Sequence, residues 1–271
     1  MINNLKVHIL GQSHVFESFV NYIKIGEAGL SPDNEPKGAF LFTGPTGTGK
    51  TETAKVLAEI LNKELLRFDM SEYKNSEKFL RDLTAKLEMS SNGIILLDEI
   101  EKGNMEIFDY FLQILSEATI SYNQKVYDLS EYYIIMTSNI GSKNIMGQDN
   151  FAIARRIVER LVKSHFRPEF LGRIRRDCQI CFKPLEYEVM KQIVKQKVET
   201  EILRLQKKGY SLEYDENILP FLMNEGVNPE FGARPVVQTV QKYIALAIIQ
   251  ANKKSGKLTI NNSQLILKQI K

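Results

Sequence analysis

The feature that most restricts the fold of this chain is a glycine-rich loop between an apolar strand pattern and a helix pattern. Positions 44 to 51 fit G-x-x-x-x-G-K-[ST] at all four specified positions. The apolar run Ala39–Thr43 precedes the loop and a helical pattern over Lys50–Asn62 follows it, which is the order of a phosphate-binding loop. Glycines let consecutive backbone N–H groups converge on a phosphate, and the helix N-terminus adds partial positive charge. The predicted phosphate-binding residues are Gly44, Pro45, Thr46, Gly47, Thr48, Gly49, Lys50 and Thr51.

A second apolar strand pattern, Ile94–Leu97, ends in two adjacent carboxylates, Asp98 and Glu99. Charge at the end of a buried strand is costly unless a cation or a reaction needs it. We expect Asp98 to hold Mg²⁺ together with the Thr51 hydroxyl, directly or through water. Glu99 is the predicted general base that polarises an attacking water molecule. With Lys50 on the β- and γ-phosphates, these residues predict a site that binds and hydrolyses ATP with Mg²⁺.

Strand and helix patterns alternate over the first two thirds of the chain, which predicts an α/β fold with a parallel sheet between helices. The strand patterns are short, nearly continuous apolar runs, as expected for strands buried on both faces. The predicted strands are Ala39–Thr43, Leu65–Asp69, Ile94–Asp98 and Tyr133–Thr137. The predicted helices are Lys50–Asn62, Glu77–Leu87, Glu106–Ser116 and Ile153–His165.

The pattern changes near Pro184, where a long amphipathic helix begins. A short strand, two more helices and a final pair of strands follow, with a turn at Asn261–Ser263. We therefore predict a large domain over residues 1–182 and a small, mixed α/β C-terminal domain over residues 183–271.

Composition excludes several classes of protein. The formal net charge of +3, from 36 basic and 33 acidic residues, is too small to argue for a nucleic-acid partner. The chain has no apolar run of about eighteen residues, so no membrane span is expected, and no secretory signal is visible. Cys178 and Cys181 form an isolated C-x-x-C without the further ligands of a zinc site, which favours two reduced thiols in a cytoplasmic protein.

Seven segments along the chain form a recognisable set of motifs: Gly11–Gln12, positions 44–51, Asp69–Tyr73, Leu97–Lys102, Met136–Asn139, Phe166–Arg173 and Gly232–Pro235. Together they resemble the second ATPase module of the Clp unfoldases, which are AAA+ ATPases, and most closely that of the disaggregases among them. The resemblance runs from about residue 8 to the C-terminus. Two origins fit this extent: a piece of a longer Clp protein, or a single-module relative.

The resemblance implies an AAA+ fold and further site residues. Asn139 matches the polar residue called sensor 1, which orients the attacking water. Arg173 matches the arginine finger that enters the site of a neighbouring subunit, although Arg175 and Arg176 follow it where the family has acidic residues. The resemblance also implies that Arg234 contacts the nucleotide as sensor 2, and that the chain forms a homo-oligomeric ring, a hexamer, acting on a protein substrate or partner. The stretch that packs near the adenine is matched by Ile9 and Leu10.

The interval Lys74–Gly93 departs from the family. Clp motors carry a glycine–aromatic loop there that grips polypeptide, whereas this interval is shorter, lacks such a pair and has the pattern of one amphipathic helix. The spacing of Phe79 with apolar neighbours indicates a core residue. A hairpin predicted over Ile120–Asp128 offers Tyr122 or Lys125 as an alternative pore contact, or is a plain surface hairpin.

Three functions fit these observations. The preferred hypothesis is an oligomeric ATPase that remodels or assembles a protein partner without the usual aromatic pore loop. The alternatives are a threading unfoldase or disaggregase that grips with the hairpin near Tyr122, and an ATP-dependent scaffold or switch that hydrolyses slowly. Glu99 and Arg173 argue against a pure switch, which needs neither. The near-neutral charge and the lack of an arginine-rich recognition helix disfavour a DNA-acting protein.

Overall fold

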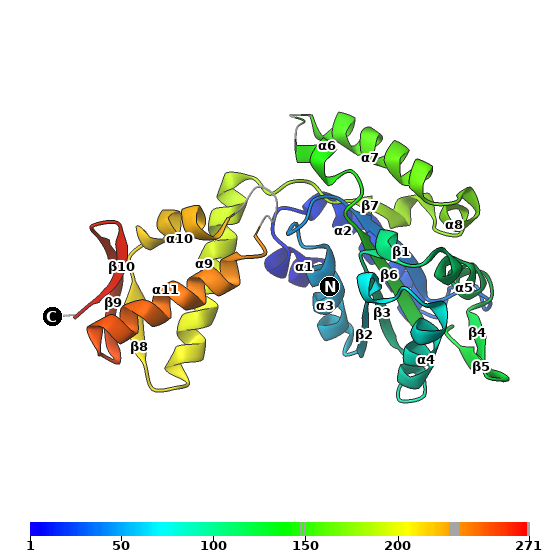
Figure 1. The fold of residues 1–271 in the computed structure, drawn as a ribbon, viewed down its shortest axis with the longest axis horizontal. Coiled ribbons are helices and arrows are strands. Elements are labelled where there is room, and N and C mark those ends of the chain that lie inside the picture. Colours follow the sequence, from blue (N-terminus) through cyan, green and yellow to red (C-terminus); the bar gives the residue numbers. More distant parts are fainter. Residues whose placement is uncertain (147, 149, 228–232, 270–271) are drawn as a thin grey trace. The chain divides into compact units, whose positions relative to one another are not determined.

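The computed structural model (Figure 1) describes residues 1–146, 148, 150–227 and 233–269. The chain divides into two compact units, each with its own hydrophobic core. The first consists of Met1–Pro45 and Gly49–Pro184, and the second of Leu185–Lys271 together with Thr46–Thr48. The boundary expected after residue 182 lies two residues before this division. Within the described ranges, every helix is too short or too polar to traverse a lipid bilayer.

The first unit is built on a five-stranded sheet (Figure 1). Its strands are β1 (Gly38–Thr43), β2 (Leu65–Asp69), β3 (Gly93–Asp98), β6 (Tyr132–Ser138) and β7 (Gln179–Cys181). They lie in the order β2-β3-β6-β1-β7, and every neighbouring pair is parallel. Strands β3 and β6 are buried along their whole length, as strands covered on both faces are. The predicted α/β fold with a parallel sheet is confirmed.

Helices flank this sheet in the first unit. They are α1 (Ile2–His8), α2 (Ser13–Glu27), α3 (Lys50–Leu61), α4 (Ser76–Leu87), α5 (Met105–Glu117), α6 (Ser142–Met146), α7 (Phe151–His165) and α8 (Pro168–Gly172), with short 3₁₀ helices η1 (Met70–Glu72), η2 (Ile100–Lys102) and η3 (Arg176–Cys178). Helix α3 contacts β2, β3 and β6, whereas α2 contacts β1. The four helices predicted between the strands are confirmed, with ends shifted by at most two residues.

Helix α4 fills most of the interval Lys74–Gly93, so the single amphipathic helix predicted there is confirmed. The Asn75 side chain caps its first turn by accepting two backbone N–H groups. Phe79 is fully buried, and its ring packs against the rings of Phe68, Tyr73 and Phe111. The prediction that Phe79 is a core residue is also confirmed.

The predicted hairpin is confirmed as the antiparallel pair β4 (Thr119–Tyr122) and β5 (Lys125–Asp128). Glu88, just after α4, holds the hairpin at two points, because its carboxylate accepts from Lys125 Nζ at 2.7 Å and from the Tyr127 hydroxyl at 2.9 Å. Tyr122 is half-buried and packs against the core of the first unit. The hairpin is therefore attached to the body of this unit on more than one side.

The second unit combines three helices with a small sheet. Its elements are α9 (Tyr187–Gln206), β8 (Ser211–Tyr214), α10 (Ile218–Gly226), α11 (Val236–Ala251), β9 (Ser255–Asn261) and β10 (Gln264–Lys268). Strand β9 lies between β8, to which it is parallel, and β10, to which it is antiparallel. Asn262 and Ser263 have positive φ in the turn between β9 and β10, so the predicted final strand pair is confirmed.

Candidate active site

The phosphate loop connects the end of β1 to the start of α3, and two of its glycines combine a positive φ with little room for a side chain. Gly44 has a φ of +128°, and a Cβ there would lie 2.4 Å from the carbonyl oxygen of Phe182. Gly49 has a φ of +102°, and a Cβ there would lie 3.2 Å from Ile9 Cγ2. Ile9, expected to lie near the adenine, is thus buried against the loop, and Leu10 follows it, half-buried. The fold thus brings residues 9, 44–49 and 182, which are far apart in the sequence, next to one another.

Lys50 is buried at the start of α3 and points its ammonium group at the loop. Its Nζ donates to the carbonyl oxygens of Gly44 at 2.6 Å and Pro45 at 2.8 Å, and to Asn139 Oδ1 at 3.0 Å. Burial lowers the pKa of Lys50 to about 8, even though nearby carboxylates, Glu101 foremost, act to raise it. A phosphate group beside Lys50 would supply the negative charge that compensates for this burial.

The carboxylate of Asp98, at the end of β3, accepts hydrogen bonds from three side chains. Its Oδ1 accepts from Thr51 Oγ1 at 2.8 Å and from Thr137 Oγ1 at 2.5 Å, and its Oδ2 pairs with Arg67 Nη2 at 2.7 Å. The two predicted Mg²⁺ ligands, Thr51 and Asp98, are therefore adjacent. The described residues contain no group of three or more His, Cys, Asp or Glu side chains able to hold a metal. A hydroxyl and one carboxylate fit Mg²⁺ nonetheless, because this ion keeps several waters and takes phosphate oxygens as further ligands.

Glu99 follows Asp98 in a left-handed backbone conformation, with a φ of +57°. Such a conformation costs about 1–3 kcal/mol for a residue other than glycine and is concentrated at functional sites. The Glu99 backbone N–H donates to Thr137 Oγ1 at 3.1 Å, which supports the turn. In the side chain, Oε2 pairs with Lys102 Nζ at 2.5 Å, and this hydrogen bond raises the pKa of Lys102.

Asn139, one residue beyond β6, connects the phosphate loop to the acidic pair. Its Oδ1 accepts from Lys50 Nζ, and its Nδ2 donates to Glu99 Oε1 at 3.0 Å. Chemistry fixes this orientation of the amide, because an ammonium group can only donate and a carboxylate can only accept. Four residues predicted from the sequence thus meet at the carboxyl edge of the sheet, namely Lys50, Asp98, Glu99 and Asn139.

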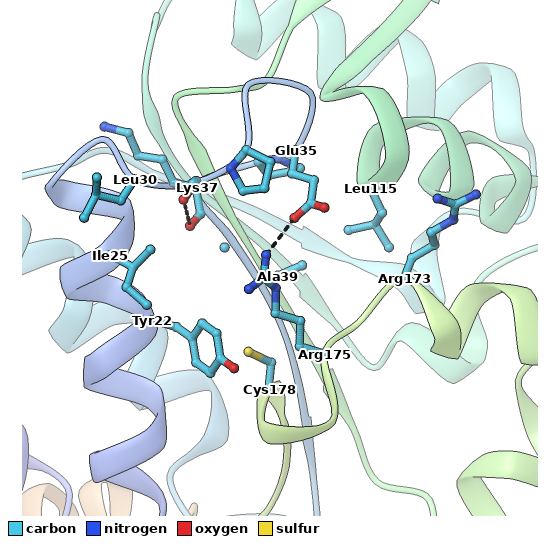
Figure 2. Close-up of a pocket in the computed structure, with 14 residues that line it drawn as sticks. Tyr22, Ile25, Leu30, Glu35, Lys37, Ala39, Leu115, Arg173, Arg175 and Cys178 are labelled. Atoms are coloured by element: carbon cyan, nitrogen blue, oxygen red, sulfur yellow. Dashed lines mark hydrogen bonds and ion pairs between the residues drawn. The ribbon is translucent and has the colours of Figure 1, made fainter.

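Arg173 lies at the other edge of the sheet. Figure 2 shows it at the end of α8, lining a pocket with Lys37 and Ala39 at the amino end of β1. The phosphate loop leaves the carboxyl end of the same strand, about 17 Å away at the rise of a β-strand. The Arg173 side chain is exposed, and among the described residues it has no hydrogen-bond or ion-pair partner. It is therefore not part of the cluster around Lys50.

Arg175 lines the same pocket in a different way. Its Nη2 pairs with Glu35 Oε2 at 3.2 Å, and its guanidinium lies over the Tyr22 ring, 5.6 Å from the centroid (Figure 2). The hydrogen bond to Glu35 raises the pKa of Arg175. The two arginines thus differ in that the Arg175 side chain is held by contacts within the chain.

Arg234 belongs to the second unit, where it is exposed in the turn before α11. Its contact with a nucleotide stays a prediction. Gly232, which completes the motif quoted with it, lies outside the described residues.

Four further residues of the site were not predicted as such: Arg67, Thr137, Glu101 and Lys102. The last three lie inside the quoted motifs Leu97–Lys102 and Met136–Asn139, so the motifs marked the segments but not the contacts. Arg67 is a charged residue within an otherwise apolar strand pattern, a signal that could have identified it.

Two family models match the chain. The AAA domain (Cdc48 subfamily) covers residues 35–176, and the C-terminal, D2-small domain of ClpB protein covers residues 185–259. Among curated relatives, the chaperone protein ClpB of Prochlorococcus marinus is 33% identical over 262 aligned positions, covering 88% of this chain and 30% of the relative. ClpB of Vibrio vulnificus is 33% identical over 297 positions, covering 98% and 34%, and ClpB of Meiothermus ruber is 34% identical over 263 positions, covering 89% and 31%.

The chain spans about a third of the length of the curated relatives it matches. The two matched domains follow one another in the order expected for the second ATPase module of a Clp protein, so the resemblance inferred from the motifs is confirmed. The chain belongs to the AAA domain family, Cdc48 subfamily, and is an AAA+ ATPase followed by a small domain of the ClpB type.

Proposed function

We propose that this chain assembles into a homo-oligomeric ring, a hexamer, in which ATP bound at each subunit interface is hydrolysed to remodel or assemble a protein partner. One observation carries the proposal. Asn139 forms hydrogen bonds with both Lys50 and Glu99 at the carboxyl edge of the sheet, whereas the Arg173 side chain is exposed at the amino edge and has no partner among the described residues. A hydrolysis site and an arginine that lies too far away to serve it are the two halves of a site shared between subunits.

In the proposed site, ATP and Mg²⁺ are held by the phosphate loop and the strand ends beside it. The backbone of residues 44–49 and the Lys50 ammonium bind the phosphates, and the adenine lies beside Ile9 and Leu10. Thr51 and Asp98 would hold Mg²⁺, whose charge would neutralise the phosphate oxygens. Arg234 contributes a second cation from the small domain.

Hydrolysis in this proposal depends on Glu99 and Asn139. The Glu99 carboxylate accepts a proton from the attacking water, and the Asn139 amide orients that water and the carboxylate together. Asn139 also accepts a hydrogen bond from Lys50, so it links the residue that binds the phosphate to the general base Glu99. Arg173 of a neighbouring subunit balances the charge of the transition state, a contribution of roughly 10³–10⁵ in rate for arginine fingers.

Remodelling without deep threading is supported by two features of the first unit. The interval that would carry the aromatic pore loop is the core-packed helix α4. The hairpin residues that could replace the loop are engaged elsewhere, because Tyr122 packs against the core and Lys125 is bound to Glu88. These contacts disfavour the threading alternative.

A reducing compartment, the cytoplasm, is part of the proposal. Cys178 and Cys181 are both buried and free, and burial raises the pKa of the Cys178 thiol to about 12. A thiol that stays protonated and buried reacts slowly with oxidants, so neither cysteine needs a disulfide partner.

The test is the ATPase rate as a function of protein concentration, for wild type, Glu99→Gln and Arg173→Ala. We expect the wild-type ATPase rate per subunit to rise with protein concentration. Both variants should lose ATPase activity at every concentration. Lys50→Ala and Arg173→Ala, each inactive alone, should regain activity when mixed, since about a quarter of the interfaces in a random equal mixture of a heterologous ring combine both intact halves. A flat, negligible rate despite nucleotide binding would instead identify an ATP-dependent switch.

A further inference from the structure

Glu101 is a half-buried acid that the proposed chemistry leaves without a role. It lies in η2, two residues beyond the general base. Its Oε1 accepts the backbone N–H of Asn139 at 3.0 Å. Its Oε2 is buried and has no hydrogen-bond donor among the described residues. Buried polar atoms are nearly always paired, so an orphaned carboxylate oxygen requires a reason for the acid to be there.

The contact of Glu101 with Asn139 ties together two strand ends. Strands β3 and β6 are parallel neighbours in register from Gly93–Tyr132 to Leu97–Met136, and both chains leave the sheet just beyond that register. Glu101 follows the first strand and Asn139 the second. Their hydrogen bond continues the connection between the strands past the last ladder pair, at the point where the Asn139 side chain is directed to Lys50 and Glu99.

Among the described residues, Glu101 is the acid at these strand ends that accepts the Asn139 backbone N–H. The other two acids are already engaged, Asp98 with Thr51, Thr137 and Arg67, and Glu99 with Lys102 and the Asn139 amide. A carboxylate accepts a backbone N–H more strongly than a neutral oxygen does, which suits the task of fixing one backbone direction.

We infer that Glu101 is a positioning residue for ATP hydrolysis, holding the Asn139 backbone so that the Asn139 amide spans Lys50 and Glu99. Glu101 acts through Asn139 and touches neither the nucleotide nor the attacking water. The inference rests on the proposed hydrolytic function, but it requires neither the ring nor a particular protein partner.

The kinetic test compares Glu101→Ala with Glu101→Gln, whose amide oxygen can still accept the Asn139 N–H. We expect Glu101→Ala to lower kcat about tenfold or more, while KM for ATP changes less than about threefold, because a lost hydrogen bond to a charged group acts here on the chemical step. Glu101→Gln should retain most of the rate. Glu117→Ala, which removes an exposed acid at the end of α5, is the matched control and should behave as wild type.

A double variant provides the decisive comparison. If Glu101 acts through Asn139, then Glu101→Ala combined with Asn139→Ala loses no more rate than Asn139→Ala alone. The inference would be overturned if the rate losses of Glu101→Ala and Asn139→Ala multiplied in the double variant. It would also be overturned if Glu101→Gln were as slow as Glu101→Ala. Circular dichroism and thermal melting establish that each variant folds, and Glu101→Gln keeps the test valid if the alanine variant does not.

A readout without turnover separates this inference from the proposed function. Hydrogen exchange of the Asn139 backbone N–H, followed by NMR, should accelerate at least about tenfold in Glu101→Ala. In Glu101→Gln the exchange rate should return towards the wild-type value. Unchanged exchange in Glu101→Ala would refute the positioning role even if the wild type hydrolyses ATP. Conversely, a wild type without ATPase activity but with this exchange pattern would refute the hydrolytic function and leave the contact established.

Discussion

The ammonium group of Lys50 should make nucleotide binding depend on pH in the alkaline range. Burial lowers the pKa of Lys50 to about 8 in the free protein. Phosphate groups beside Nζ favour the charged form, so the bound-state pKa lies closer to the ordinary lysine value of 10.5 or above it. A group whose pKa rises on binding takes up protons when the nucleotide binds. Affinity is therefore highest below pH 8 and falls as the pH rises through 8.

The size of the change in nucleotide affinity with pH follows from the charged fraction of Lys50 in the free protein. That fraction is about 0.9 at pH 7, about 0.5 at pH 8 and about 0.1 at pH 9 for a pKa of about 8. If the bound form stays charged throughout, affinity falls about tenfold between pH 7 and pH 9, which is ~1.4 kcal/mol. At pH 8, binding should take up about half a proton per nucleotide.

Isothermal titration calorimetry with ADP, without Mg²⁺, measures both quantities when repeated in buffers of different ionisation enthalpy. Lys50→Arg is the matched control, because a guanidinium group stays charged across this range and its affinity should not depend on pH from 7 to 9. A wild-type affinity that stays constant over that range, with no proton uptake at pH 8, would refute the reasoning. It would mean that Lys50 remains fully charged in its buried position.

Three other substitutions test separate parts of the fold and site. Gly44→Ala should cost about 2 kcal/mol or more of unfolding free energy, seen by thermal melting, because of the positive φ and the close carbonyl of Phe182; an unchanged melting temperature would contradict that geometry. Thr137→Val removes the hydroxyl between Asp98 and the Glu99 backbone, and should lower kcat about tenfold in a steady-state ATPase assay while the chain stays folded. Phe79→Ala should cost about 3–5 kcal/mol in urea denaturation, whereas a loss below 1 kcal/mol would indicate that α4 is not packed on the core.

The parts of the site that could be predicted from the sequence are those whose chemistry is contained in one short segment. The phosphate loop needs particular glycines and a lysine at fixed spacing, and the acidic pair needs only a strand end. The carboxyl ends of parallel strands meet at one edge of the sheet, so recognising parallel strands was enough to expect that Lys50 and Asp98 lie close together. The core role of Phe79 was likewise visible, because helical spacing with apolar neighbours is a local pattern.

The contacts between segments could not be predicted in this way. Arg67, Thr137 and Glu101 reach the site from three different elements, β2, β6 and η2, and their partners depend on strand register and on the turn at Glu99. No local pattern encodes that turn, since Glu99 adopts a left-handed conformation that residues other than glycine seldom take.

Helix α2 was missed for another reason. Its buried residues recur at helical spacing, but the segment is rich in aromatic and β-branched side chains and lies before the first predicted strand, outside the alternation that guided the assignment. The residues concerned are Val15, Phe16, Phe19, Val20 and Ile23.

The charges around the phosphate loop balance within the first unit itself. Asp98 pairs with Arg67, Glu99 pairs with Lys102, and the Glu101 charge is the strongest of those that favour the charged form of Lys50. Three acids and three bases therefore offset one another in a region where unpaired charge would be costly. Because Asp98 already pairs with Arg67, an Mg²⁺ ion held by this carboxylate would compete with the arginine for it. The ion pair is half-exposed on the arginine side, so the arginine could withdraw into solvent without a buried charge being left behind. Replacement of Arg67 by Mg²⁺ would therefore require the movement of one surface side chain.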